Sequence, residues 1–419
     1  MNEDRFTASL LACVACGIIA GAMFRLPPVI FANDASRWNT VWSLNAGKGY
    51  VIDEAPYYTN DKVLRAGHYY SSKPALMPTA VAGLAWLLKG AAGLVLPRDQ
   101  ADLVRIVLIL INVLPFGVMV ALYARLLERS GYGLPARRFC VAVAAFGTYL
   151  TSYSVTLNNH TQAAWAAFFA LCCSIRIHGD GRRRWRYFFF AGLFAAWAAA
   201  NEAPALLFVA ILLAILLRCD PKRALLGFLP PALAVAAAYF YTTYLATGRL
   251  RPYSISFDSQ FYLFPGSYWL SPIGIDAMHE PKWLYVFHMV LGHHGVFSLT
   301  PVFVFSFCGV FLKDKLQLIN RMGLFLTLYL LVLYALTTNN YGGQCQGLRW
   351  LFWLIPFWLI SLAPAVEQGF RSRLFRVLAF AALLISVVSV GFALSGGGDI
   401  GPWGASWLYQ FYRSIRWAP

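Results

Sequence analysis

The sequence predicts an all-α, polytopic integral membrane protein with about 11 transmembrane helices and with re-entrant or juxtamembrane helices in its first outer loop. Composition is the first reason: 59% of the 419 residues are hydrophobic, 12% are charged, and the mean hydropathy is +0.58. Soluble domains carry about 25% charged residues. The second reason is that apolar segments of spanning length alternate with short polar linkers along the chain. A water-soluble enzyme is therefore excluded.

The expected spans follow from the stretch of about 17–25 apolar residues that crosses a bilayer. In chain order they cover residues 7–24, 103–124, 139–157, 161–177, 187–200, 203–217, 224–246, 296–312, 322–337, 349–366 and 377–394. The first lacks a basic start and a small-residue cleavage site, so we expect a retained anchor rather than a signal peptide. The polar turn at 201–204 separates two short spans that would form a tight hairpin. We expect one transmembrane domain over 1–419. No internal repeat is visible, which favours a site facing outward over the alternating-access path of a transporter.

Basic residues indicate the orientation, because Lys and Arg concentrate in cytoplasmic loops. Five short linkers hold 18 of the 34 Lys and Arg residues. They are 125–138, 176–186, 218–223, 313–321 and 367–376. The linkers between them are nearly free of basic residues. We therefore expect a cytoplasmic N-terminus in an inner (plasma) membrane, and the net charge of +16 does not indicate a nucleic-acid partner.

Three segments then face outward: a first outer loop at 25–74, a second long outer loop at 248–295, and a short outer C-terminal tail at 395–419. Segment 75–96 is apolar enough to span, but a span there would invert every later loop. Prolines break its start and Lys89 interrupts it. We expect this segment to re-enter or lie at the interface, with a true span as the alternative.

The first outer loop combines charged and aromatic residues directly after a span. Asp34 and Arg37 are three apart, so on a helix they share a face. Trp38 and Trp42 are four apart and would form the interfacial stripe of a helix lying on the membrane. One interpretation of these residues is an Asp–Arg helix pair at the level of the headgroups.

The order of a span, an outer loop with D-x-x-R at 34–37, and a Lys-Pro-x-Leu step at 73–76 resembles the GT-C superfamily of polyprenyl-phosphate-sugar-dependent glycosyltransferases. The aminoarabinose transferase and protein O-mannosyltransferase branches are nearest in pattern. The resemblance implies that Asp34 is the essential acid of the first outer loop. It also matches Arg37 and Lys73 to the family's arginine and lysine.

A late outer loop whose arginine leads into a proline-containing span is matched by Arg349 and Pro356. These families usually have a second acid directly after the first, where this chain has Ala35. A two-carboxylate site, and with it a divalent metal, is therefore not assigned, although Asp53 could supply a second carboxylate in space. No other cofactor is assigned.

Transfer from a lipid-linked sugar phosphate displaces phosphate, a good leaving group, so cations are needed more than a general acid. Arg37, Lys73 and Arg349 are the candidates for binding this phosphate. Asp34 is the candidate catalytic base for the acceptor hydroxyl. Three other outer arginines remain competing candidates for the phosphate, with binding of anionic headgroups as the alternative: Arg65, Arg249 and Arg251.

Further candidates lie in the other outer segments. The turn at 158–162 contains His160, a possible substrate contact, although simple turn chemistry with one hydrogen-bonded histidine also fits. In the next outer turn Glu202 is read as a cap before Pro204 rather than a second acid. Tyr341 lies in the glycine-rich loop at 339–347, which would let the chain approach a ligand closely.

The second outer loop holds four of the seven histidines, namely His279, His288, His293 and His294. No H-x-x-x-H or C-x-x-C pattern accompanies them, and adjacent histidines on a helix would point apart. The sequence therefore predicts no metal site here, and His293 and His294 are kept as candidate substrate contacts.

Together these observations predict a hexosyl- or pentosyltransferase that moves a sugar from a polyprenyl-phosphate donor to an acceptor on the outer face. Its partners would be the lipid-linked donor, membrane lipid, and an acceptor lipid, glycan or protein. The alternative is a transporter or flippase of a lipid-linked saccharide. That alternative requires charged residues within the spans at both leaflets, and the spans contain few.

Overall fold

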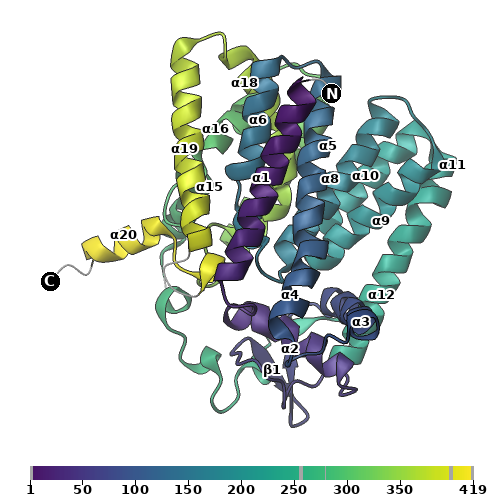
Figure 1. Cartoon of the computed structure of the whole chain (residues 1–419), viewed down its shortest axis with the longest axis vertical. Coiled ribbons are helices and arrows are strands. Elements are labelled where there is room, and N and C mark those ends of the chain that lie inside the picture. The colour runs from purple at the N-terminus through teal and green to yellow at the C-terminus, as the bar shows by residue number, and fades with distance from the viewer. Residues whose placement is uncertain (1–2, 254–257, 279, 396–399, 417–419) are drawn as a thin grey trace.

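The computed structural model describes residues 3–253, 258–278, 280–395 and 400–416. Within these residues the fold is a helical bundle with one small two-stranded sheet. Its long helices run roughly parallel (Figure 1). The principal ones are α1 (Glu3–Arg25), α5 (Leu114–Ser130), α6 (Leu134–Phe146), α8 (Asn159–His178), α9 (Trp185–Asn201), α10 (Leu206–Cys219), α12 (Leu229–Thr247), α17 (Gln317–Thr337), α18 (Ile355–Gly369) and α19 (Arg373–Ser395).

Six of the described helical segments are long and apolar enough to cross a membrane, so the chain is an integral membrane protein. They are Arg5–Arg25, Gln100–Ser130, Pro221–Thr247, Gln317–Thr337, Arg349–Gly369 and Arg373–Ser395. The segment Arg349–Gly369 is central, because 89% of its most apolar window is buried inside the protein. The expected count of about 11 spans is not confirmed.

Some of these segments are built from several helical pieces. Gln100–Ser130 joins α4 (Gln100–Leu108), the π-helix η1 (Ile109–Val113) and α5, while Pro221–Thr247 joins α11 (Pro221–Arg223), the π-helix η3 (Ala224–Phe228) and α12. The 3₁₀ helix η8 (Arg349–Leu354) precedes α18, and η2 (Ala203–Ala205) precedes α10.

Two expected spans are not single helices. Residues 139–157 divide into α6 and α7 (Tyr149–Tyr153), because Thr148 is extended. Residues 296–312 divide into α15 (Val296–Leu299), η7 (Pro301–Phe303) and α16 (Val304–Gly309). Proline has no N–H to donate, so Pro301 ends the first piece and begins the next.

The two ends of the bundle differ. The N-terminus and α11 lie at the top of Figure 1, whereas α2 (Phe31–Asn45), the sheet and α3 (Leu76–Ala92) lie at the bottom. The first outer loop thus folds into a layer across one end of the helices. This layer carries most of the residues that the sequence singled out.

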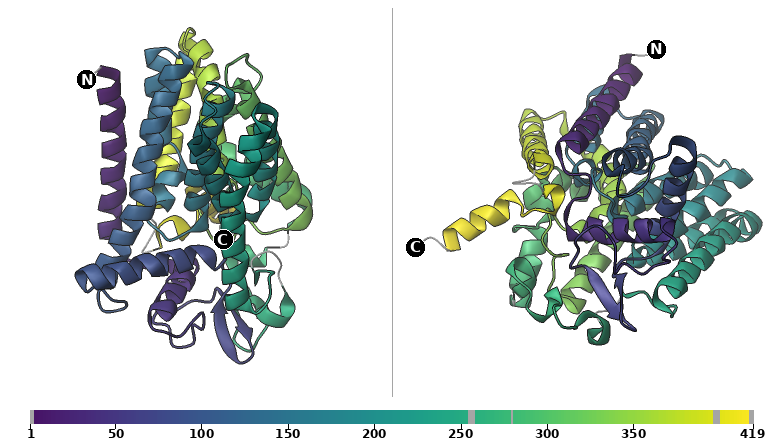
Figure 2. Two further views of the ribbon diagram at one scale, coloured as in Figure 1. Left: turned by 90° about the vertical axis from the view of Figure 1, so that its right-hand side faces the viewer. Right: turned by 60° about the horizontal axis from the view of Figure 1, so that its bottom comes forward.

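Helix α3, which contains most of the segment 75–96, lies crosswise to the bundle. Figure 1 views it nearly end-on, and the left view of Figure 2 shows it extending across the ends of the long helices. It packs against α2 and ends at Gly93, whose φ of +68° is accessible to glycine. Its 17 residues form one unbroken helix.

The sheet is a hairpin of β1 (Lys62–Arg65) and β2 (His68–Ser71). Ala66 and Gly67 form its turn with φ of +48° and +81°, the left-handed values that a two-residue hairpin turn needs. The antiparallel register pairs Lys62 with Ser71. The residues that flank this pair therefore meet at the open end of the hairpin.

The second outer loop contains α13 (Ser259–Tyr262), η5 (Tyr268–Leu270), η6 (Gly274–Ala277) and α14 (Lys282–Val290). His279 lies outside the described residues. The tail forms η9 (Gly401–Trp403), which packs into the body, and α20 (Trp407–Arg416), which projects from it (Figures 1 and 2).

Candidate active site

Helix α2 carries polar side chains into the protein interior. Ten of its 15 residues are buried, including Asn33, Asp34 and Arg37. Trp38 is fully buried, so α2 does not present an interfacial tryptophan stripe to a membrane. Polar groups are costly to bury without hydrogen bonds. The hydrogen-bond partners of these side chains therefore show which segments α2 holds together and which of its side chains are left to bind a ligand.

Asp34 uses both carboxylate oxygens to hold backbone. Its Oδ2 accepts a hydrogen bond from the Ile30 N–H and its Oδ1 accepts one from the Leu157 N–H, each at 2.9 Å. The side chain is 0% exposed. Asp34 thus ties the start of α2 to the segment that precedes α8. No ion pair joins it to Arg37 among the described residues, so the expected Asp–Arg helix pair does not form there.

Arg37 is bound by neutral groups. One of its terminal nitrogens donates to the Asn33 carbonyl at 2.8 Å and to the Asn33 side-chain oxygen, and the other donates to Asn159. Its Nε is buried and has no hydrogen-bond partner among the described residues. The guanidinium is therefore fixed in place without a carboxylate directly against it.

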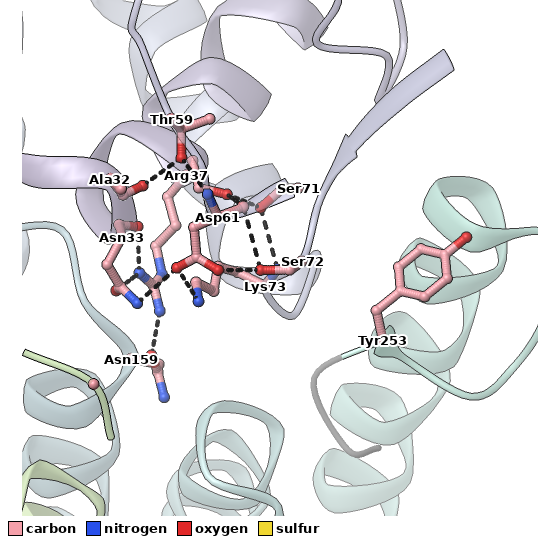
Figure 3. A network of polar contacts seen from close by, with 12 residues as sticks. Ala32, Asn33, Arg37, Thr59, Asp61, Ser71, Ser72, Lys73, Asn159 and Tyr253 are labelled. Carbon is pink, nitrogen blue, oxygen red and sulfur yellow. Dashed lines mark hydrogen bonds and ion pairs between the residues drawn. The ribbon is translucent and has the colours of Figure 1, made fainter. Parts of the chain in front are cut away.

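Lys73 forms an ion pair with Asp61, an acid that the sequence analysis did not single out (Figure 3). Asp61 also accepts hydrogen bonds from Ser72 Oγ at 2.6 Å and from Asn33 Nδ2 at 3.1 Å. The hairpin produces this pair, because Asp61 precedes β1 and Ser72 and Lys73 follow β2. Asn33 contacts both Arg37 and Asp61 and so connects the two cations.

Arg349 is the first residue of η8 and is distant in sequence from Arg37 and Lys73. Its guanidinium lies over the ring of Trp403 at 4.9 Å, a cation–π contact. No ion pair joins Arg349 to an acid in the described part of the chain. Its charge nevertheless lies close enough to Arg37 and Lys73 to disfavour their protonated forms. The three predicted phosphate-binding cations therefore form one electrostatic group.

A second polar group adjoins these cations from α8 and the turn after α9. His160 Nδ1 bonds to the Glu202 carboxylate, and Asn159 donates to the same carboxylate at 2.7 Å. The His160 Nε2 is buried and has no hydrogen-bond partner among the described residues. Glu202 occupies the N-cap position of η2, as expected for a cap before Pro204, but its side chain makes no capping hydrogen bond and binds His160 and Asn159 instead.

The charges of this site favour an anion. Burial raises the pKa of Asp34 to about 7 and that of Glu202 to about 8. Burial would raise the pKa of Asp61 as well, but Lys73, Ser72 and Arg37 hold it below its ordinary value. Near neutral pH, one fully ionised acid therefore faces three basic side chains.

The basic side chains are themselves affected by burial. Burial lowers the pKa of Lys73 to about 8 and that of Arg37 to about 10, and Arg349 adds to both effects while Asp61 opposes them. A negative ligand at this position would relieve the repulsion among the three cations. The arrangement is suited to binding a phosphate or another oxyanion.

The other candidate residues lie elsewhere. Asp53 is part of the hairpin surface, where it bonds to His68 Nδ1 and the Tyr69 N–H, each at 2.6 Å. His293, His294 and Tyr341 form a separate cluster with one another, in which the Tyr341 ring stacks on His294 at 4.9 Å. The structure thus gathers Asp34, Arg37, Lys73, Arg349 and His160. It places Asp53 on the hairpin surface and the cluster of His293, His294 and Tyr341 on the other side of Arg349, whose charge reaches His294.

Sequence reasoning missed Asp61 and interpreted Glu202 as a cap, although both acids line this site. Asp61 could have been found from the pattern Lys62–Ser71, because two β-prone runs around Ala66-Gly67 predict a hairpin whose register places Asp61 beside Lys73. The local sequence places Glu202 in an outer turn but does not identify its partners, which come from α8.

Asp34 and Asp61 do not form a two-carboxylate metal site. Asp34 faces two backbone N–H groups and Asp61 faces Lys73, while Ala35 occupies the position beside Asp34. Metal ligands need oxygen atoms that converge on one point.

No protein-family model matches the sequence, and no curated protein matches it. Among solved structures, the chain is similar to the oligosaccharyltransferase of Archaeoglobus fulgidus in complex with Zn and sulfate, with 14% identity and a TM-score of 0.48. The match covers 97% of this chain and 55% of that one.

The chain is likewise similar to the archaeal oligosaccharyltransferase AglB from Archaeoglobus fulgidus in complex with an inhibitory peptide and a dolichol-phosphate. Identity is 14%, the TM-score is 0.49, and the match covers 100% of this chain and 58% of that one. The chain thus spans a little more than half the length of these solved chains.

Proposed function

We propose that this chain is a membrane glycosyltransferase that moves a sugar from a polyprenyl-phosphate donor to an acceptor on the outer face of the membrane. The observation that supports it is the group of three cations, Arg37, Lys73 and Arg349, at one end of the bundle. Only Lys73 has a carboxylate directly against it among the described residues. A lipid phosphate would supply the missing negative charge.

The proposed orientation places this end of the bundle outside the cell. The basic linkers that favour the cytoplasm are those beside the N-terminus, α11 and the junction of α18 with α19. They lie at the end of the molecule opposite α2 and the sheet (Figure 1). The donor phosphate would then reach the cations at the outer membrane–water boundary.

In the proposed reaction the acceptor hydroxyl oxygen forms a bond to the anomeric carbon of the donor. The bond between that carbon and the phosphate oxygen breaks, and the polyprenyl phosphate leaves with the electron pair. Arg37, Lys73 and Arg349 stabilise the negative charge that develops on the phosphate. One such contact is typically worth about 2.7–4 kcal/mol of the barrier.

The proton of the acceptor hydroxyl needs a base. Asp34 is the base predicted from the sequence, but both of its oxygens accept backbone hydrogen bonds. The pair of His160 and Glu202 is better suited when Glu202 is ionised, a form that becomes common as pH rises through its pKa of about 8. The carboxylate then accepts the Nδ1 proton and leaves the Nε2 lone pair without a partner among the described residues. We therefore assign the proton to the His160–Glu202 pair and a positioning role to Asp34.

The test is sugar transfer by purified protein in lipid nanodiscs, from a synthetic short-chain polyprenyl-phosphate sugar to a panel of lipid and glycan acceptors. Arg349→Ala is expected to lower kcat about 100- to 1,000-fold. Arg65→Ala, at the far end of the hairpin, is the matched control and should keep transfer within about two-fold. Donor flipping across vesicles without transfer would instead support a flippase.

A further inference from the structure

A second cluster of titratable side chains shares no residue with the proposed phosphate site and adjoins it on the side of Arg349. It consists of Glu280, His288, His293 and His294, which we call the histidine cluster. His288 lies on α14, Glu280 precedes that helix, and His293 and His294 occupy the turn between α14 and α15. The two adjacent histidines are not helical, so the expectation that their side chains point apart on a helix is wrong.

The geometry of the histidine cluster brings potential ligand atoms together. One such atom from each of Glu280, His288 and His293 lies within 4.8 Å of the other two. Glu280 Oε1 lies 3.8 Å from His288 Nε2. In a tetrahedral zinc site with bonds of about 2.0–2.1 Å, ligand atoms are about 3.3–3.5 Å apart. Small side-chain rotations would therefore shorten the distances between these atoms enough for all three to bind one ion.

The partners of these atoms also favour a bound cation. Glu280 Oε2 accepts a hydrogen bond from Tyr341, whereas the buried Oε1 has no hydrogen-bond partner among the described residues. His293 Nδ1 bonds to His294 Nδ1 at 2.5 Å, and the buried His293 Nε2 likewise has no partner there. A ligating histidine typically uses its other ring nitrogen in this way to fix its orientation.

The chemistry of the donor set is suitable as well. A carboxylate and two imidazoles are a donor set that zinc and similar divalent ions accept.

We propose that Glu280, His288 and His293 bind a divalent transition metal ion of the zinc class, with His294 and Tyr341 as the groups that orient the ligands. Three protein ligands leave a fourth position for water or for His294. This site is independent of the proposed glycosyl transfer, because it shares no ligand with the phosphate-binding cations.

The location of the ion would connect three segments distant in the sequence. The ligands belong to the second outer loop, and Tyr341 belongs to the glycine-rich loop that leads to Arg349. Ser406 Oγ, which precedes α20, donates to the His293 carbonyl at 2.6 Å. Metal binding would therefore stabilise the packing of the loop, the glycine-rich segment and the tail against one another.

The experiment measures metal in protein purified through a histidine-free tag, stripped with EDTA and reloaded with Zn²⁺. We expect about one equivalent of tightly bound zinc and a higher Tm for the loaded protein than for the stripped protein. Reloading with Co²⁺ should give the visible spectrum of a four- or five-coordinate nitrogen and oxygen site without thiolate charge-transfer bands. The absence of those bands would exclude the eight cysteines as ligands.

His293→Gln and Glu280→Gln should each weaken zinc binding at least about 10-fold and remove the zinc-dependent rise in Tm, with the stripped variants folded. His68→Ala, a histidine on the hairpin far from the cluster, is the matched control and should bind zinc as the wild type does. The proposal is overturned when wild-type protein binds no zinc above the Glu280→Gln variant. It is also overturned when zinc gives no rise in Tm. The cluster would then be only an ion pair between Glu280 and His288.

Discussion

Asp61 and Lys73 form an ion pair across the open end of the β1–β2 hairpin, and this pair is the direct link between the sheet and the candidate phosphate site. Their side chains are only 14% and 16% exposed. Asp61 holds the cation in place through a register that depends on the two-residue turn at Ala66 and Gly67. The hairpin thus positions a cation of the candidate phosphate site in addition to shaping the first outer loop.

Removing the acid should therefore destabilise the first outer loop. Asp61→Asn leaves Lys73 in a mostly buried position without its counter-charge, and we expect the free energy of unfolding to fall by about 3 kcal/mol. The double variant Asp61→Asn/Lys73→Met should regain most of this loss, because no charge is then left unpaired. Denaturant unfolding in detergent measures all three. A double variant no more stable than the single one would contradict a coupled pair.

The pKa of Lys73 predicts a pH dependence of donor binding. Since burial lowers that pKa to about 8, the fraction of protonated Lys73 falls as pH rises through this value. Affinity for the lipid phosphate should therefore decrease above pH 8, and Lys73→Arg should shift the decrease to higher pH because arginine stays protonated. Equilibrium binding of a labelled polyprenyl phosphate between pH 6 and 10 measures this. The same midpoint in both proteins would exclude Lys73 as the titrating group.

The variant Asp34→Asn tests whether Asp34 positions the backbone or acts as the catalytic base. Asp34→Asn offers one acceptor oxygen where two backbone N–H groups now bind, so one of them loses its partner. We expect a loss of about 1–3 kcal/mol in the free energy of unfolding. Because burial raises the pKa of Asp34 to about 7, the wild-type carboxyl favours folding in its protonated form. That contribution is present in acid and is lost as pH rises through about 7.

In turnover, Asp34→Asn should mainly lower the amount of folded protein rather than kcat per folded molecule. Active-site titration with a tight-binding donor analogue separates the two quantities. A variant of unchanged stability with kcat lowered more than 100-fold would instead assign the base to Asp34, as the sequence predicts.

The His160–Glu202 pair gives the complementary prediction. His160→Gln should lower kcat about 100- to 10,000-fold with little change in donor affinity, because a general base acts on the acceptor proton and not on phosphate binding. Glu202→Gln should have a smaller effect, since an amide can still orient the imidazole. Single-turnover transfer measures kcat, and His68→Ala serves as control. A His160→Gln enzyme that loses donor affinity alone would make His160 a substrate contact.

Much of the bundle could be predicted from composition and charge. Expected spans such as 7–24, 322–337 and 377–394 fall inside α1, α17 and α19, because apolar length and basic flanks are local properties of the chain. Segments 139–157 and 296–312 were wrong as single helices, since mean hydropathy does not register an extended Thr148 or a Pro301 within an apolar run.

The sequence by itself determined which residues of the candidate site are basic and that Asp34, Arg37 and Lys73 share one loop. Only the tertiary structure decided their partners. Arg37 lies 122 positions before Asn159, and His160 lies 42 before Glu202. Hydrophobicity and charge patterns report which side of a membrane a residue occupies, whereas ion pairs and hydrogen bonds form over a few ångströms. They therefore depend on how distant helices pack, which no local pattern records.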